Sequence, residues 1–155
     1  MNLIGRRCHR VSVDRLTLKL LTLIEGKGQG VAVMLHGPPG VGKTLTAETI
    51  ALATGRPLFT VSVAEIGIEP PEVERKLSDV FADAARWGAV LFIDEADVFV
   101  EERTKFDLKR NAMVSVFLRC LEYYDGIIIM TTTNRITSIN VAVQSRIIWP
   151  SSTTI

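Results

Sequence analysis

The stretch LHGPPGVGKT, which runs from Leu35 to Thr44, decides the fold of this 155-residue chain. It follows directly on the apolar run VAVML at 31–35 and ends on a lysine and a threonine. The part from Gly37 to Thr44 fits the pattern G-x-x-x-x-G-K-[ST] at each fixed position. A simple turn would explain the glycines and prolines. It would not explain a lysine followed by a threonine at the start of a helical stretch.

That pattern predicts a loop that binds phosphate groups. Its glycines let backbone N–H groups turn inward and approach phosphate oxygens closely, and the helix that follows adds the positive end of its dipole. Lys43 can reach the β- and γ-phosphates of a nucleotide, and the Thr44 hydroxyl can ligate Mg²⁺. We therefore expect the phosphates of a nucleotide to contact the loop and the first helical turn: Gly37, Pro38, Pro39, Gly40, Val41, Gly42, Lys43, Thr44 and Leu45.

After residue 30, short apolar runs alternate with helical patterns. Runs rich in β-branched residues predict buried strands over 31–35, 58–63, 89–94 and 127–133, with a fifth starting at 146–149. Helices are expected over 43–54, from 70–71 onward, and over 107–124. The second of these helices has apolar residues spaced for one face: Val73, Leu77, Val80, Phe81, Ala84 and Ala85.

Strands that alternate with helices predict an α/β fold, here the P-loop NTPase three-layer sandwich around a parallel sheet. Ligands on such sheets bind beyond the carboxyl ends of the strands. The organisation that we expect is an N-terminal segment at 1–30, a nucleotide-binding core at 31–150 and a tail at 151–155.

The charge balance argues against a dedicated nucleic-acid surface. The chain has 18 basic and 17 acidic side chains, a formal net charge of +1, whereas nucleic-acid binding requires a basic face. Three aromatic residues, Trp87, Tyr123 and Tyr124, fall on predicted helices, so we expect them to pack in the core rather than to stack on bases.

Cysteine usage and hydropathy predict a soluble intracellular protein. Cys8 and Cys120 form neither a disulfide framework nor a metal-binding pair. The longest N-terminal apolar stretch, at 16–24, is too short to span a bilayer and contains Lys19. The first ten residues lack the features of a signal peptide.

Two acids follow the apolar run at 89–94. Asp94 is placed to hold Mg²⁺, directly or through water, and Glu95 can deprotonate a water for attack on the γ-phosphorus. Acids often follow strands, so the pair alone does not indicate a function. Together with the phosphate loop in the same sheet, it favours Mg²⁺ binding and hydrolysis. For Asp97 we prefer the simpler interpretation that it caps the next turn.

Two further residues have both a chemical and an ordinary interpretation. Asn134 follows the run at 127–133 and can position the attacking water if that strand lies beside the strand of the loop; otherwise it is a turn residue. Arg146 can stabilise charge on the γ-phosphate, within the chain or from a neighbouring subunit, or can be a surface arginine.

Four stretches together resemble the AAA+ ATPases. GPPGVGKT at 37–44 looks like the Walker A motif, and VLFIDEAD at 90–97 looks like Walker B. TTTNR at 131–135 is similar to the sensor-1 stretch, and SRI at 145–147 is similar to the arginine-finger stretch. The resemblance covers roughly residues 30 to 150, and within it 108–135 looks most like a subgroup of AAA ATPases from filamentous fungi.

The resemblance implies a Mg²⁺-dependent ATPase that works as a homo-oligomeric ring, often a hexamer, on a macromolecular partner. Glu95, Asn134 and Arg146 would then be catalytic, with Arg146 reaching the nucleotide of the neighbouring subunit. Three features depart from the family. The helical lid is missing after Pro150, the loop at 63–72 lacks the aromatic residue of many ring unfoldases, and Asn140 stands where an aspartate is usual.

Two other functions are left open. A non-catalytic nucleotide-binding or interaction module would fit a chain without a lid. A nucleic-acid helicase is suggested by DEAD at 94–97, but it would need a second motor domain and a basic face.

Overall fold

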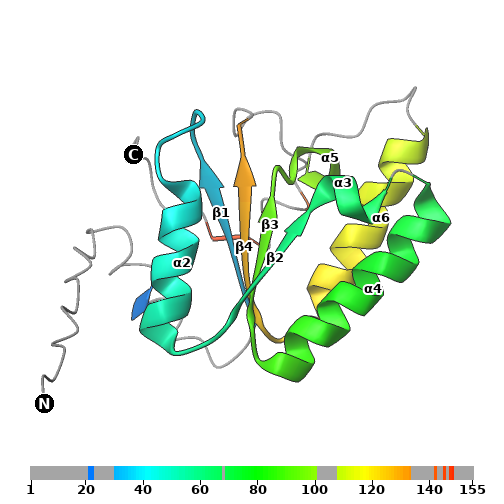
Figure 1. Ribbon diagram of the computed structural model, residues 1–155. Coiled ribbons are helices and arrows are strands. Elements are labelled where there is room, and N and C mark those ends of the chain that lie inside the picture. Colours follow the sequence, from blue (N-terminus) through cyan, green and yellow to red (C-terminus); the bar gives the residue numbers. More distant parts are fainter. Residues whose placement is uncertain are drawn as a thin grey trace, which may run out of the picture.

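The computed structural model describes residues 21–22, 30–67, 69–100, 108–133, 142, 145 and 147–148. A central sheet separates two layers of helices, so these residues form a three-layer α/β sandwich (Figure 1). The predicted fold class is therefore confirmed.

The sheet has four parallel strands: β1 (Val31–His36), β2 (Leu58–Ser62), β3 (Val90–Asp94) and β4 (Ile127–Thr132). Their order is β1-β4-β3-β2, so β4 lies between the strand that precedes the loop and the strand that ends in Asp94. Ile148 forms a single parallel bridge with Val33 of β1. Of the fifth strand predicted to start at 146–149, the described residues show this one bridge.

The strands are buried on both faces, and this is why their sequences are continuously apolar rather than alternating. Val31, Val33 and Leu35 of β1 belong to one core, whereas Ala32 and Met34 belong to the other. The side-chain period of two residues assigns neighbours along a strand to opposite faces. Both cores therefore depend on the same five-residue run.

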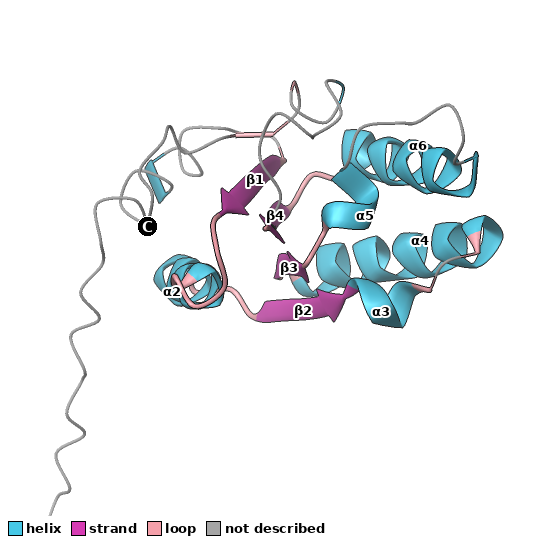
Figure 2. Ribbon diagram, turned by 90° about the horizontal axis from the view of Figure 1, so that it is seen from above, coloured by secondary structure: helices cyan, strands magenta, loops and turns pink. Residues whose placement is uncertain are grey.

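Helices cover the two faces unequally, as the view from above shows (Figure 2). One face carries α2 (Lys43–Thr54), and the other carries α4 (Pro70–Trp87) and α6 (Leu108–Tyr123). Two helices of a single turn, α3 (Val63–Ile66) and α5 (Asp97–Val100), lie on the side of α4 and α6. The larger core lies under these four helices, and its largest fully buried side chains are Met34, Ile66, Leu77, Leu91, Ile93, Phe99, Phe117 and Ile128.

Helix α4 shows how an amphipathic pattern fixes a helix on a sheet. Pro70 at its first position needs no N–H partner, and Gly88, in the left-handed conformation, ends it. Of the six apolar positions predicted to share a face, four are buried: Val73, Leu77, Phe81 and Ala84. Val80 is half-buried, but Ala85 is exposed, so its inclusion was wrong.

The observed bounds differ from the predicted ones where a local hydrogen bond changes the backbone. Val63 was predicted to end a strand, but it begins α3, because the Ser62 hydroxyl accepts a hydrogen bond from the Ala64 N–H at 3.3 Å and caps that turn. The start of the predicted helix at 107–124 falls partly outside the described residues, and α6 is seen from Leu108.

Two of the aromatic residues were wrongly predicted to be in the core. Tyr123 is 82% exposed and Trp87 is 55% exposed, although the Trp87 ring still packs edge-on against Phe59 at a centroid distance of 5.2 Å. Tyr124 packs edge-on against Phe81 at 5.0 Å, and burial raises the pKa of its hydroxyl above the ordinary value.

Apolar packing, rather than charge, holds α6 against α4. The ion pairs Arg119–Glu74 and Lys109–Glu69 join the two helical regions, but all four side chains are at least half-exposed. Exposed ion pairs of this kind contribute at most about 1 kcal/mol each.

Among the residues that the structure describes, none of the helices has the length and hydrophobicity needed to cross a lipid bilayer.

Candidate functional site

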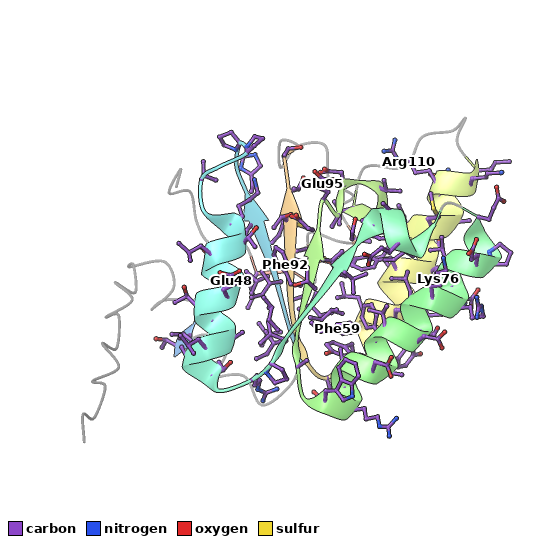
Figure 3. All side chains as sticks on the ribbon, viewed as in Figure 1. Glu48, Phe59, Lys76, Phe92, Glu95 and Arg110 are labelled. Atoms are coloured by element: carbon purple, nitrogen blue, oxygen red, sulfur yellow. The ribbon has the colours of Figure 1, made fainter. Side chains whose placement is uncertain are left out.

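A cavity of about 440 Å³ lies at the carboxyl end of the sheet, beside the loop that follows β1. Its volume falls in the range of small-molecule sites, about 300–1,000 Å³. Figure 3 shows Glu95 at this end of the sheet, whereas Phe92 lies within the core. The lining residues come from the loop, α2, β3 and β4: Pro39, Gly40, Gly42, Lys43, Thr44, Leu45, Asp94, Glu95, Thr131 and Thr133.

The bend of the loop depends on two glycines. Gly40 has φ +83° and Gly42 has φ +91°, both in the left-handed region that side chains with a Cβ rarely adopt. No heavy atom lies within 4 Å of a Cβ added at either position. The backbone conformation, rather than lack of space, therefore requires glycine here.

Lys43 is bound to the loop that precedes it. Its Nζ donates to the carbonyl oxygens of Gly37 at 2.7 Å and Pro38 at 3.0 Å. The Gly37 N–H in turn donates to the Thr132 carbonyl oxygen at 3.3 Å, which attaches the start of the loop to β4. The loop is thereby closed around an ammonium group that also lines the cavity.

The first turn of α2 presents a positive helix end to the same cavity. Gly42 is its N-cap and supplies no side-chain hydrogen bond, and the first turn contains no acid. Backbone N–H groups at a helix start lack intrahelical acceptors, so they favour an anion there. Thr44 and Leu45, in this turn, are exposed. The loop, the helix end and Lys43 together form a site suited to negatively charged oxygens.

The acidic side of the cavity is built by the turn after β3. Asp94 is the last residue of that strand, and Glu95 follows it with φ +55°, the left-handed region. The Thr131 hydroxyl of β4 donates to Asp94 Oδ1 and accepts from the Glu95 N–H at 2.9 Å. Asp94 is partly buried, whereas Glu95 is exposed and lines the cavity.

The carboxylate of Asp97 has a partner on β4. It is the first residue of α5, and its carboxylate accepts a hydrogen bond from the Thr132 hydroxyl. Thr132 is 1% exposed and does not line the cavity. This contact fixes α5 to β4 behind the acidic turn.

The oxygen groups available for a metal ion are few. No cluster of three or more His, Cys, Asp or Glu side chains occurs within the described ranges. Thr44 and Asp94 both line the cavity, and a hydroxyl and a carboxylate are the kinds of ligand that Mg²⁺ accepts. Because Mg²⁺ usually keeps several waters and takes only one or two carboxylates, such a pair fits that ion.

The structure brings together most of the residues that the sequence singled out. Pro39, Gly40, Gly42, Lys43, Thr44, Leu45, Asp94 and Glu95 line one cavity. Gly37, Pro38 and Val41 belong to the same loop but do not line the cavity. The carbonyl groups of Gly37 and Pro38 accept hydrogen bonds from Lys43. Asn134 and Arg146 lie outside the described residues.

Sequence reasoning missed two residues of the cavity, Thr131 and Thr133. A signal was present in the sequence, because a run of threonines ends an otherwise apolar strand. The missing information was the strand order, since only the position of β4 between β1 and β3 brings these threonines beside Asp94.

Comparison with known proteins identifies relatives of this core. The human ATPase family AAA domain-containing protein 3B is 32% identical over 121 residues, which is 74% of this chain and 18% of that protein. Protein CdcH of Halobacterium salinarum is 32% identical over 120 residues, 72% of this chain and 16% of that protein. The mitochondrial sorting homolog of Caenorhabditis elegans is 32% identical over 121 residues, 74% of this chain and 35% of that protein. The chain thus spans between 16% and 35% of these relatives.

A solved structure shares the fold. A chain in the structure of the E. coli MS115-1 HORMA:CdnC:Trip13 complex superimposes with a TM-score of 0.63 at 24% sequence identity. The match covers 76% of this chain and 46% of that one.

The match to a family profile agrees with these relatives. Residues 33–148, more than half of the chain, match the profile described as "ATPase family associated with various cellular activities (AAA)". The matched range includes the loop, both acids and the threonines of β4. Membership of this family supports nucleotide binding and ATPase activity in general. The protein described here therefore belongs to the AAA family of ATPases.

Proposed function

We propose that this core binds Mg·ATP in the 440 Å³ cavity and hydrolyses it. The observation that carries the proposal is that one cavity is lined by a lysine, a helix start, a threonine hydroxyl and two acids. These are the groups that phosphoryl transfer needs, because its catalysis consists largely of positioning and charge stabilisation.

The loop and α2 would hold the phosphates. Backbone N–H groups between Gly37 and Thr44 donate to phosphate oxygens, and the Lys43 ammonium group neutralises charge on the β- and γ-phosphates. In this binding mode, phosphate oxygens replace the carbonyl groups of Gly37 and Pro38 as acceptors for Lys43.

Thr44 and Asp94 are the groups that would hold Mg²⁺, the first through its hydroxyl and the second directly or through water. When bound, the cation supplies positive charge to the oxygens of the transferred phosphoryl group.

Glu95 would act as the general base. Its carboxylate takes a proton from water, the water oxygen bonds to the γ-phosphorus, and the bond from that phosphorus to the β–γ bridging oxygen breaks. ADP and inorganic phosphate are the products. Asn134 would position the water and Arg146 would stabilise the charge that develops, as predicted from the sequence.

The proposal also covers the oligomeric state, the partner and the cellular location. We propose a homo-oligomeric ring, such as a hexamer, in which Arg146 serves the nucleotide of the neighbouring subunit and ATP turnover remodels a macromolecular partner. We also propose an intracellular location and a relationship of 108–135 to AAA ATPases of filamentous fungi.

The base is tested by replacing Glu95 with Gln. Calorimetric titration with Mg·ATP and a phosphate-release assay are run on the wild type, on Glu95→Gln and on Glu48→Gln. Glu48 is an exposed glutamate of α2 away from the sheet end where Glu95 lies (Figure 3). We expect Glu95→Gln to bind ATP with wild-type affinity and to lose turnover about 100-fold or more, and Glu48→Gln to behave as the wild type.

Two results would contradict this assignment. Unchanged turnover in Glu95→Gln would exclude that residue as the base. Binding without phosphate release in the wild type would favour the non-catalytic module instead. The ring is tested separately by measuring the mass in solution with and without Mg·ATP; a monomer in both states would contradict the proposed role of Arg146 in a neighbouring subunit.

A further inference from the structure

One threonine of β4 contacts both acids of the cavity. The Thr131 hydroxyl donates to Asp94 Oδ1 and accepts from the Glu95 N–H at 2.9 Å. The Thr131 carbonyl oxygen accepts from the Ala96 N–H, also at 2.9 Å. Thr131 is only 1% exposed, so water does not compete strongly for these bonds.

The hydroxyl bond restricts the side chain of Asp94. A hydroxyl has one proton to donate, and here Asp94 Oδ1 receives it. A hydrogen bond to a carboxylate is stronger than one between neutral groups, so it holds the carboxylate in one orientation. The second carboxylate oxygen is then free to coordinate a metal ion or to accept a hydrogen bond from a metal-bound water.

The same residue holds the backbone of Glu95. A φ of +55° is unfavourable for a residue with a Cβ, by about 1–2 kcal/mol. Both N–H groups of the turn, those of Glu95 and Ala96, donate to oxygens of Thr131. These two bonds offset the unfavourable backbone conformation, and that conformation sets the direction in which the Glu95 side chain leaves the turn.

We propose that Thr131 is a positioning residue that sets the orientation of both acids of the ATPase site, through its hydroxyl to Asp94 and through the Glu95 backbone. This inference rests on the proposed function, because it assigns Thr131 an effect on the metal side and on the base side of the same reaction. Thr131 itself is not a base and donates no proton to the substrate.

The neighbouring residue provides a matched control. Thr132 belongs to the same strand, is also 1% exposed, and donates its hydroxyl to a carboxylate, that of Asp97. Its hydroxyl proton goes to Asp97, whereas the Thr131 hydroxyl bonds to Asp94 and to the Glu95 N–H. Replacing either threonine with valine removes one buried hydroxyl that donates to a carboxylate, at nearly constant side-chain shape.

The test compares Thr131→Val, Thr131→Ser and Thr132→Val in the full chain. Amide hydrogen exchange of Glu95 is followed by NMR without nucleotide, Mn²⁺ affinity is measured by electron paramagnetic resonance with the ATP analogue AMP-PNP, and kcat and KM are measured for Mg·ATP. In Thr131→Val we expect Glu95 amide exchange to be about tenfold faster, since its acceptor is gone. We expect Mn²⁺ to bind about fivefold more weakly and kcat to fall about tenfold, with KM nearly unchanged.

Thr131→Ser should restore all three values to within about twofold of the wild type, because it keeps the hydroxyl. Thr132→Val should leave Mn²⁺ affinity and kcat unchanged. If Thr131→Val does not fold, Thr131→Ala takes its place with the same expectations. Unchanged Mn²⁺ affinity and kcat in the variant beside an active wild type would overturn this inference alone. A wild type that binds no Mn²⁺ with AMP-PNP would overturn the proposed function, and this inference with it.

Discussion

The ammonium group of Lys43 lies 2.7 Å from the carbonyl oxygen of Gly37, six residues earlier in the chain. This bond, with a second one to the Pro38 carbonyl oxygen, places the positive charge within the bend of the loop rather than in open solvent. These two bonds restrict the rotamers of the side chain in the structure, and binding of a triphosphate would exchange the carbonyl acceptors for phosphate oxygens.

The first prediction concerns this charge. Replacing Lys43 with methionine keeps the length and the apolar stem of the side chain but removes the ammonium group. We expect ATP affinity to fall about 30-fold, which corresponds to about 2 kcal/mol. Calorimetric titration measures it. Lys76→Met, on α4 and outside the cavity, is the matched control, and an equal loss in both variants would contradict a specific role for Lys43.

The second prediction separates the backbone conformation of the loop from general stability. Gly42 and Gly55 cap the two ends of α2, have φ +91° and +65°, and leave open space for an added Cβ. Gly42→Ala and Gly55→Ala should therefore each lower the free energy of unfolding by about 1 kcal/mol. Only Gly42→Ala should weaken ATP binding, because only Gly42 lines the cavity. Urea unfolding and calorimetry measure the two effects, and equal ATP affinities would refute this distinction.

The third prediction concerns the core under α4. Leu77 is fully buried, whereas Leu52 on α2 is 71% exposed. Leu77→Ala should lower the free energy of unfolding by about 2–5 kcal/mol, since it leaves a cavity. Leu52→Ala should change it by no more than about 0.5 kcal/mol. Urea unfolding followed by circular dichroism measures both, and similar losses in the two variants would show that α4 is not packed as described.

The fourth prediction is a pH dependence on the surface of α4. A hydrogen bond from Lys76, together with its positive charge, lowers the pKa of Glu72 below 4.5. Because the pKa is lowered by folding, this pair stabilises the fold above the unfolded pKa, and the effect is lost as the pH falls through the folded pKa. In Lys76→Met the pKa of Glu72 should rise toward 4.5, its ordinary value. An NMR titration of the Glu72 carboxyl carbon checks this, and an unchanged pKa would exclude Lys76 as the cause.

Much of the fold could be predicted because its signals are local. The run at 31–35 is apolar throughout, which is typical of a strand buried on both faces, and Gly55 ends α2 at the predicted place. The two helices of a single turn, α3 and α5, could not be predicted. Segments of four residues have too few positions to show a helical period.

The candidate site was predictable in so far as its residues are contiguous in sequence. The loop and the pair Asp94–Glu95 are local motifs, and the structure brings them to one cavity. The contribution of Thr131 was not predictable, because its contact with Asp94 joins positions 37 residues apart and depends on strand order. The left-handed backbone of Glu95 was hidden for a similar reason, since nothing in a glutamate indicates a positive φ.

The central claim is that the loop from Gly37 to Thr44 and the acids after β3 form one Mg·ATP site. A crystal structure with Mg²⁺ and AMP-PNP tests it most directly. The account predicts triphosphate density in the 440 Å³ cavity, with Lys43 Nζ bonded to β- and γ-phosphate oxygens and Asp94 beside the metal ion. Nucleotide bound elsewhere, with Lys43 still bonded to the Gly37 and Pro38 carbonyl groups, would contradict it.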